Sequence, residues 1–190
     1  MSEKTRTFVS KFWYMNVLLL FTGGTISMVR DAETGALHPA DIQTFKTYVP
    51  ELFAGDIHVD MIPFEPLLDS SDLNPDNWRQ MAQTVQQHYD AYDGFVILHG
   101  TDTMAYSASA LSFMFDNLCK PVVFTGSQLP VGVLRSDAKE NLLTAIEIAA
   151  AYDADGKALV PEVTVYMDGE LYRGNRTTKR NAEHFSAFNS

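Results

Sequence analysis

Three turns of this 190-residue chain place glycine beside hydroxyl side chains directly after a short apolar run. The runs LLLF, VIL and VVF lead into TGGT at residues 22–25, HGTDT at 99–103 and TGSQ at 125–128. Glycine lets a ligand approach the backbone closely, and a threonine or serine hydroxyl can attack a carbonyl carbon once a base removes its proton. In a single such turn, the glycine, threonine and serine residues more often serve only to form the turn. Three on one predicted sheet edge, with Asp102 among them, favour a functional site.

Two other polar segments could supply charge to that site. In DSSD, residues 69–72, a carboxylate could receive a ligand ammonium group, although the segment could also be only a turn that caps a helix. Residues 173–180 hold four of the 14 basic residues, and a solvated loop is the alternative there. A lysine held near Asp102 and a threonine hydroxyl could lose its proton once desolvated and serve as a base. The motifs GxxxxGK[ST], GxGxxG and GxSxG are absent from the sequence, so nucleotide binding and serine-hydrolase chemistry lose support.

The elements that must position these residues alternate between strand and helix patterns. Short apolar runs predict strands at 16–21, 57–62, 94–98 and 121–124, and a hairpin of 162–167 with 171–172. Helical spacing predicts helices after Asp41, from Pro75 to about Tyr89, from Met104 to Leu118 and from Ser136 to about Ala151. The sequence therefore predicts an α/β fold, with a mostly parallel (mixed) sheet and helices on both faces. Ligands of such sheets bind at the carboxyl ends of the strands, where the three turns lie.

Composition argues against several other classes of function. The net charge of −10 and the pI of about 4.8 disfavour nucleic acid and anionic membrane surfaces as partners. The single cysteine, Cys119, leaves no internal disulfide and no thiolate zinc site, and the five histidines have no metal-ligand spacing. We therefore expect no metal ion. The apolar run at 17–21 is far shorter than the ~20 residues that span a bilayer.

The segments at 21–26, 99–103, 125–128 and 172–179 together resemble the L-asparaginase family. DSSD and HGTDTMAY, residues 99–106, are similar to its type I, cytoplasmic bacterial branch. The resemblance implies a flavodoxin-like or Rossmann-like N-terminal asparaginase domain in the cytoplasm. It implies hydrolysis of L-asparagine to L-aspartate and ammonia, with L-glutamine as a weaker substrate and without a metal or organic cofactor. Together with the negative charge, it leads us to expect neither a nucleic-acid nor a membrane partner.

The resemblance also implies roles for individual residues. Those implied to be catalytic are Thr25, Thr101, Asp102 and Lys179. Thr25 would be the usual candidate nucleophile, and Lys179 would be the base for Thr101. Those implied to bind substrate are Gly24, Asp69, Ser70, Ser71, Gly100, Thr101, Asp102 and Ser127. Asp69 and Asp102 would hold the α-ammonium group, and Ser70 and Ser71 would contact the α-carboxylate side. Which threonine attacks first is open at this stage.

Two departures from the family pattern affect these expectations. Many relatives have a tyrosine in the loop after TGGTI, but here Gly35 is followed by Ala36, Leu37 and His38. The partner that activates Thr25 is therefore open, and a residue outside this segment is one candidate. Family members also carry a second, C-terminal domain, and a neighbouring subunit's C-terminal domain closes their active site.

We therefore interpret the chain as a leader (1–15) and the N-terminal catalytic domain (16–190), with the C-terminal domain absent. We expect little activity until it is complemented. The resemblance implies that the full-length form is a homodimer or a dimer of dimers. Two alternatives are an amino-acid-binding or regulatory module without turnover, and a component of a tRNA-dependent amidotransferase, which the negative charge disfavours.

Overall fold

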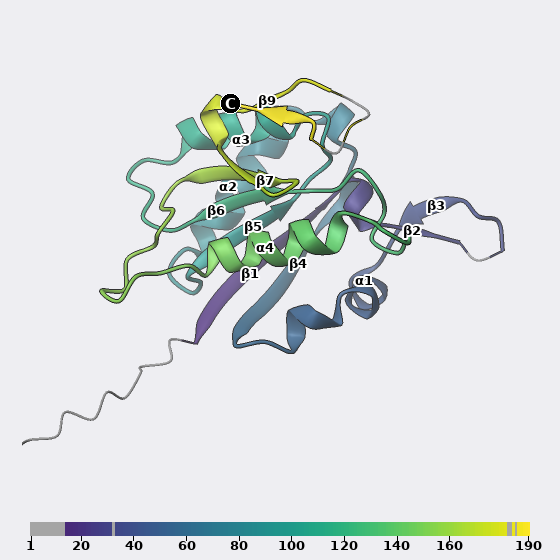
Figure 1. Cartoon of the computed structure of the whole chain (residues 1–190). Helices are drawn as coiled ribbons and strands as arrows, with labels where there is room; N and C mark the ends of the chain where they lie inside the picture. The colour runs from purple at the N-terminus through teal and green to yellow at the C-terminus, as the bar shows by residue number, and fades with distance from the viewer. Residues whose placement is uncertain (1–13, 32, 182–183, 185) are drawn as a thin grey trace, which may run out of the picture.

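The computed structural model describes residues 14–31, 33–181, 184 and 186–190 (Figure 1). Its centre is a six-stranded sheet in the order β4-β1-β5-β6-β7-β8. The strands are β1 (Met15–Gly23), β4 (Ile57–Leu68), β5 (Gly94–Leu98), β6 (Val122–Thr125), β7 (Val163–Met167) and β8 (Glu170–Arg173). The first five in that order pair in parallel, and β8 is antiparallel to β7. The predicted mixed, mostly parallel sheet is confirmed.

Helices cover both faces of this sheet. α1 (Ile42–Tyr48) and α4 (Ala138–Ala149) pack on one face, and α2 (Pro75–His88) and α3 (Met104–Met114) pack on the other. Figure 1 shows α4 in front of the sheet and α2 and α3 behind it. Alternate residues of β1 serve the two cores: Val17 and Leu19 pack with α1 and α4, whereas Leu18 and Leu20 pack with α2 and α3. A strand buried on both faces reads as the unbroken apolar run seen in the sequence.

Strand β4 is longer than predicted and continues six residues past Ile62 to Leu68. Pro63 and Pro66 lie within this extension, and proline is normally absent from the middle of a sheet. Because β4 pairs only with β1 and forms the edge of the sheet, missing proline N–H groups are tolerated there. The extension delivers Leu68 beside Gly23 and thus brings the DSSD segment to the carboxyl ends of the strands.

Helices α3 and α4 are shorter than predicted. Helix α3 ends at Met114, so Phe115 and Leu118 of the predicted apolar stripe lie beyond it. Phe115 is extended and Asn117 has a φ of 55°, which turns the chain away from the helix axis. Both apolar residues still pack on the core that α2 and α3 form, which explains why their spacing resembled a helical face. Helix α4 occupies Ala138–Ala149 rather than the whole of 136–151.

Three smaller features complete the fold. An antiparallel hairpin of β2 (Met28–Arg30) and β3 (Leu37–Pro39) follows the first turn and was not predicted, and it projects from one side of the molecule (Figure 1). β9 (Thr178–Lys179) pairs with β10 (Phe188–Asn189). Most of the predicted leader, residues 1–13, lies outside the described residues, whereas Met15 already belongs to β1. In the described part of the chain, no helix has the length and apolar character needed to cross a membrane.

Candidate active site

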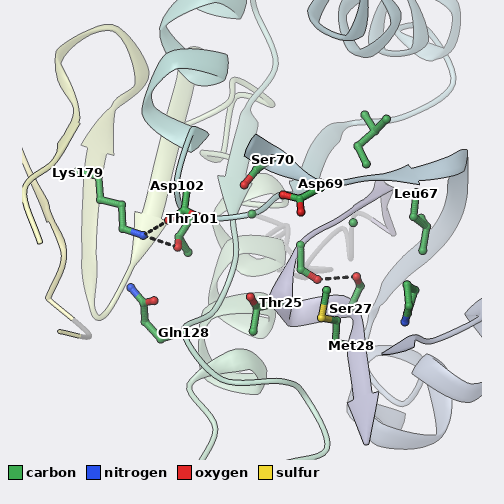
Figure 2. Close-up of a pocket in the computed structure, with 15 residues that line it drawn as sticks. Thr25, Ser27, Met28, Leu67, Asp69, Ser70, Thr101, Asp102, Gln128 and Lys179 are labelled. Carbon is green, nitrogen blue, oxygen red and sulfur yellow. Dashed lines mark hydrogen bonds and ion pairs between the residues drawn. The ribbon is translucent and has the colours of Figure 1, made fainter. Parts of the chain in front are cut away.

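The carboxyl ends of β1, β4 and β5 open into a cleft of about 380 Å³ (Figure 2). All three glycine turns, the third only through Gln128, contribute to its walls together with the DSSD segment and the basic segment. The lining residues are Gly23, Gly24, Thr25, Ser27, Met28, Pro39, Leu67, Leu68, Asp69, Ser70, Gly100, Thr101, Asp102, Gln128 and Lys179. Residues from segments far apart in the chain therefore form one site.

Glycines allow three of these segments to touch. Gly24 has a φ of 84°, and a Cβ built on it would lie 2.5 Å from the Gly100 nitrogen. A Cβ on Gly100 would collide with Ser70 Oγ. Any side chain at either position would push the walls of the cleft apart. The two glycines predicted to bind substrate thus also set the spacing of the residues beside them.

Lys179 joins two of the predicted catalytic residues. Its Nζ donates a hydrogen bond to Thr101 Oγ1 at 2.7 Å and contacts Asp102 Oδ1 at 2.8 Å. The lysine side chain is only 11% exposed, whereas that of Asp102 is 70% exposed. Thr101 is buried just before α3 begins at Met104, so the first N–H groups of that helix lie at the same sheet edge. The predicted arrangement of threonine, lysine and aspartate is present, and a donor-rich helix end lies next to it.

Lys179 reaches Thr101 because its segment packs closely on α3. The 3₁₀ turn η4 (Gly174–Arg176) begins at a glycine whose added Cβ would lie 2.8 Å from Ser112 Oγ and 3.0 Å from the Ala108 carbonyl oxygen. The Thr177 hydroxyl then donates to the Arg173 carbonyl at 2.6 Å and closes the turn. The backbone of this basic segment is therefore folded through Lys179, whereas the side chains of Arg173, Arg176 and Arg180 are exposed.

The DSSD segment presents a carboxylate and a hydroxyl to the cleft. Asp69 accepts hydrogen bonds from both the backbone nitrogen and the hydroxyl of Ser71, each at 2.9 Å. These bonds hold the pKa of Asp69 below its usual value, so the carboxylate is anionic at neutral pH. The Thr103 hydroxyl donates to the Ser70 carbonyl at 2.6 Å and ties the segment to the start of α3. Ser71 is exposed and does not line the cleft, so the structure does not bring it to the predicted substrate position.

Thr25 lines the cleft without a hydrogen-bonding partner for its hydroxyl among the described residues. It begins the 3₁₀ turn η1 (Thr25–Ser27), which Ser27 closes through a 2.7 Å hydrogen bond to the Gly24 carbonyl. Ala36, Leu37 and His38, which stand where the resemblance led us to expect a tyrosine, are exposed on the hairpin of β2 and β3 or lie at its tip. The missing tyrosine therefore has a structural consequence, because none of the described residues contacts the Thr25 hydroxyl as a base.

Gln128 lines the cleft where Ser127 was expected. The Ser127 hydroxyl donates back to the Leu129 carbonyl at 2.5 Å, and Ser127 is buried outside the cleft wall. The structure therefore does not bring the side chain of Ser127, one of the residues predicted to bind substrate, into the wall of the cleft. Gln128 is the next residue of the same motif, and only its position at the end of the β6 turn could have indicated it. The stretch from 128 to 137 separates this turn from α4, so a helix N-terminus does not follow it directly.

His99 lies buried beneath the second turn, with 1% of its surface exposed. Its Nδ1 contacts the Gly100 carbonyl oxygen at 2.7 Å and its Nε2 contacts Ser107 Oγ at 2.9 Å, while Trp78 Nε1 donates to the same Oγ at 2.9 Å. Burial lowers the pKa of His99 to about 4, so the ring is neutral near pH 7. With a proton on Nδ1, the ring donates to Gly100 and accepts from Ser107. This network fixes the peptide that precedes Thr101.

Residues 16–190 match the family model described as "Asparaginase, N-terminal". The chain belongs to the asparaginase family. It is 47% identical over 176 residues to L-asparaginase 1 of Escherichia coli K12, covering 92% of this chain and 50% of that protein. It is 37% identical to one component of the glutamyl-tRNA(Gln) amidotransferase of Pyrococcus abyssi, covering 92% of this chain and 40% of that protein.

Structural comparison agrees with the sequence comparison. The fold superposes on L-asparaginase I of Vibrio cholerae with a TM-score of 0.82 and 44% identity, covering 94% of this chain and 52% of that one. The asparaginase-family chain thus spans about half the length of the curated relatives it matches. The resemblance seen in the motifs is confirmed at the level of family and fold.

Proposed function

We propose that this chain carries the catalytic half of an enzyme that hydrolyses L-asparagine to L-aspartate and ammonia, with L-glutamine as a poorer substrate. The observation that carries the proposal is the hydrogen bond of 2.7 Å between Lys179 Nζ and Thr101 Oγ1 inside a cleft with carboxylates. Asp69 and Asp102 suit the substrate's α-ammonium group, and Ser70 and the glycine turns suit its α-carboxylate. We propose a cytoplasmic location from the resemblance to the type I branch and from the single cysteine.

The chemistry follows from the positions of the hydroxyls. A threonine oxygen attacks the side-chain amide carbon of asparagine, and its proton passes to an unprotonated lysine, which for Thr101 is Lys179. Backbone N–H groups of the turns and of the start of α3 stabilise the oxyanion that forms. The carbon–nitrogen bond then breaks, the nitrogen takes the proton and leaves as ammonia, and water hydrolyses the ester to release aspartate. Thr25 presents a second hydroxyl to the same cleft.

Turnover is favoured over a module that only binds an amino acid. A binding module needs the two carboxylates but has no use for a lysine within hydrogen-bond distance of a buried threonine. A role in a tRNA-dependent amidotransferase would require contact with nucleic acid, and the net charge of −10 opposes it. Retention of radiolabelled tRNA in a filter-binding assay would support that role instead.

Ammonia release tests the proposal directly. We would measure it from asparagine and glutamine for the 190-residue chain, and for the chain fused to the C-terminal half of Escherichia coli L-asparaginase 1. We expect little ammonia from the chain alone and turnover of asparagine by the fusion, because family active sites are closed by a C-terminal domain. Thr101→Val in the fusion is the negative control. Binding of asparagine by both forms without any ammonia would overturn the proposal in favour of a binding module.

A further inference from the structure

Gln128 brings a neutral amide to a cleft whose charged lining residues are Asp69, Asp102 and Lys179. In Figure 2 it lies with Thr25 on the side opposite Asp69 and Ser70. If the α-ammonium group of a substrate lies at Asp69, an extended substrate directs its side-chain amide toward Thr25 and Gln128. The position of Gln128 therefore corresponds to the reacting end of the substrate.

The backbone of Gln128 is held by two residues at the start of α4. Asp137 accepts from the Gln128 nitrogen at 2.9 Å through Oδ2 and from the Leu129 nitrogen at 3.1 Å through Oδ1. Asn141, which is 1% exposed, donates to the Gly126 carbonyl at 3.0 Å and to Asp137 Oδ2 at 3.2 Å. The same asparagine accepts a bond from the backbone nitrogen that follows β7, which joins this loop to the next turn. The side chain of Gln128 thus starts from a well-fixed point.

The side-chain nitrogen of Gln128 has a hydrogen-bonding partner, whereas its oxygen has none in the part of the chain that the structure describes. Its Nε2 donates to the His184 carbonyl oxygen at 3.3 Å. Among the described residues no donor contacts its Oε1, and Figure 2 shows that oxygen turned toward Thr25, with the nitrogen on the far side. An amide oxygen only accepts hydrogen bonds, so any ligand group that binds Gln128 Oε1 must present an N–H or O–H group.

We propose that Gln128 Oε1 accepts a hydrogen bond from the side-chain –NH₂ group of the substrate and thereby favours asparagine over the product aspartate. The inference rests on the proposed function and adds a specificity-determining residue to it. Asparagine offers two N–H donors at this position, whereas the carboxylate of aspartate offers none and places its own oxygens against Oε1. The same contact that holds the substrate amide therefore disfavours the product after ammonia leaves.

The test is a comparison of asparagine and aspartate binding to the 190-residue chain by ligand-observed NMR, which distinguishes the two amino acids by chemical shift. Gln128→Met keeps the length of the side chain and removes the acceptor. We expect it to raise the dissociation constant for asparagine about fivefold, the effect of one hydrogen bond, and to leave that for aspartate unchanged or lower. Gln43→Met on α1, a glutamine outside the cleft, is the matched control and should change neither constant.

A second variant separates the contact from a loss of structure. Gln128→Glu keeps acceptor oxygens at this position, and we expect it to retain asparagine binding while weakening aspartate binding further by charge repulsion. If Gln128→Met leaves the ratio of the two dissociation constants unchanged, the role of Gln128 is wrong and the proposed function stands. If the unsubstituted chain and the fusion bind neither amino acid, both proposals fail.

Discussion

The two threonines of the cleft have opposite surroundings. Thr101 is buried, and its hydroxyl accepts a hydrogen bond from Lys179, which in turn contacts Asp102. Thr25 is half-buried, and its hydroxyl has no hydrogen-bonding partner among the described residues. Thr101 thus contacts Lys179, the residue that we propose as its base, whereas Thr25 has no such partner among the described residues. The difference indicates that a threonine on a glycine turn marks a cleft but does not by itself make a nucleophile.

The scaffolds below the two turns also differ. The turn at Thr101 rests on a side-chain network of His99, Ser107 and Trp78. The turn at Thr25 depends on close backbone contact, since Gly24 lies directly against Gly100. The turn at Thr101 should therefore respond to changes in protonation and hydrogen bonding. The turn at Thr25 should respond to changes in side-chain volume.

Loss of the base should have the largest effect. Lys179→Met in the fusion should lower ammonia release by about 10⁴-fold, which corresponds to about 5.5 kcal/mol in the activation barrier, because neither threonine would then have a base among the described residues. Lys139→Met, which removes a surface lysine paired with Glu51, is the matched control and should alter the rate less than about twofold. Retention of a tenth of the rate by Lys179→Met would show that the base lies elsewhere and that the two threonines are more alike than their contacts indicate.

A side chain added at the first turn should have the next largest effect, in this case on stability. Gly24→Ala should reduce the free energy of unfolding by about 4 kcal/mol, because it combines a left-handed backbone with a Cβ pressed against Gly100. Gly169→Ala is a close control, since Gly169 has a φ of 82° and open space around the added Cβ, and should cost only about 1 kcal/mol. Denaturant titration measures both. Equal losses would mean that backbone conformation alone, and not contact between the two turns, sets the cost.

Protonation should affect the second turn. Because the folded state lowers the pKa of His99 to about 4 from 6.5, the unfolded state binds more protons between these values, and stability falls as the pH falls through this window. The loss should approach roughly 3 kcal/mol near pH 4, since one pKa unit corresponds to about 1.4 kcal/mol. Thermal or denaturant unfolding from pH 7 to pH 4 measures it.

A His99→Gln variant provides the control for that pH dependence. It should be less stable at pH 7 but should lose the His99 contribution to the slope between about pH 6.5 and pH 4. The acidic groups with lowered pKa, such as Asp69, act near and below the lower end of this window. An identical slope in both proteins would show that His99 is not the titrating group.

The sequence predicted those parts of the site that depend on local chemistry. Apolar runs followed by glycine turns located β1, β5 and β6, and the residue types in them indicated Thr25, Thr101 and Asp102. Three-dimensional packing decided the rest. The edge position of β4 allowed two prolines inside a strand, and the turn at Asn117 ended α3 before its apolar spacing did. Whether a side chain faces the cleft depends on a single hydrogen bond, as at Ser127, and spacing in the sequence carries no record of that.

The third turn should show the smallest effect and completes the comparison of the turns. The Ser127 hydroxyl donates its hydrogen bond to the Leu129 carbonyl. Ser127→Ala should therefore reduce the free energy of unfolding by about 1 kcal/mol and change the KM for asparagine less than about twofold. Steady-state kinetics of the fusion and denaturant titration test the two parts separately. An increase in KM of about fivefold or more without loss of stability would return Ser127 to the cleft wall as a substrate contact. The side chain would then have to leave Leu129 when substrate binds. The third turn would then resemble the turn at Thr25, whose hydroxyl has no hydrogen-bonding partner among the described residues, more than the turn at Thr101.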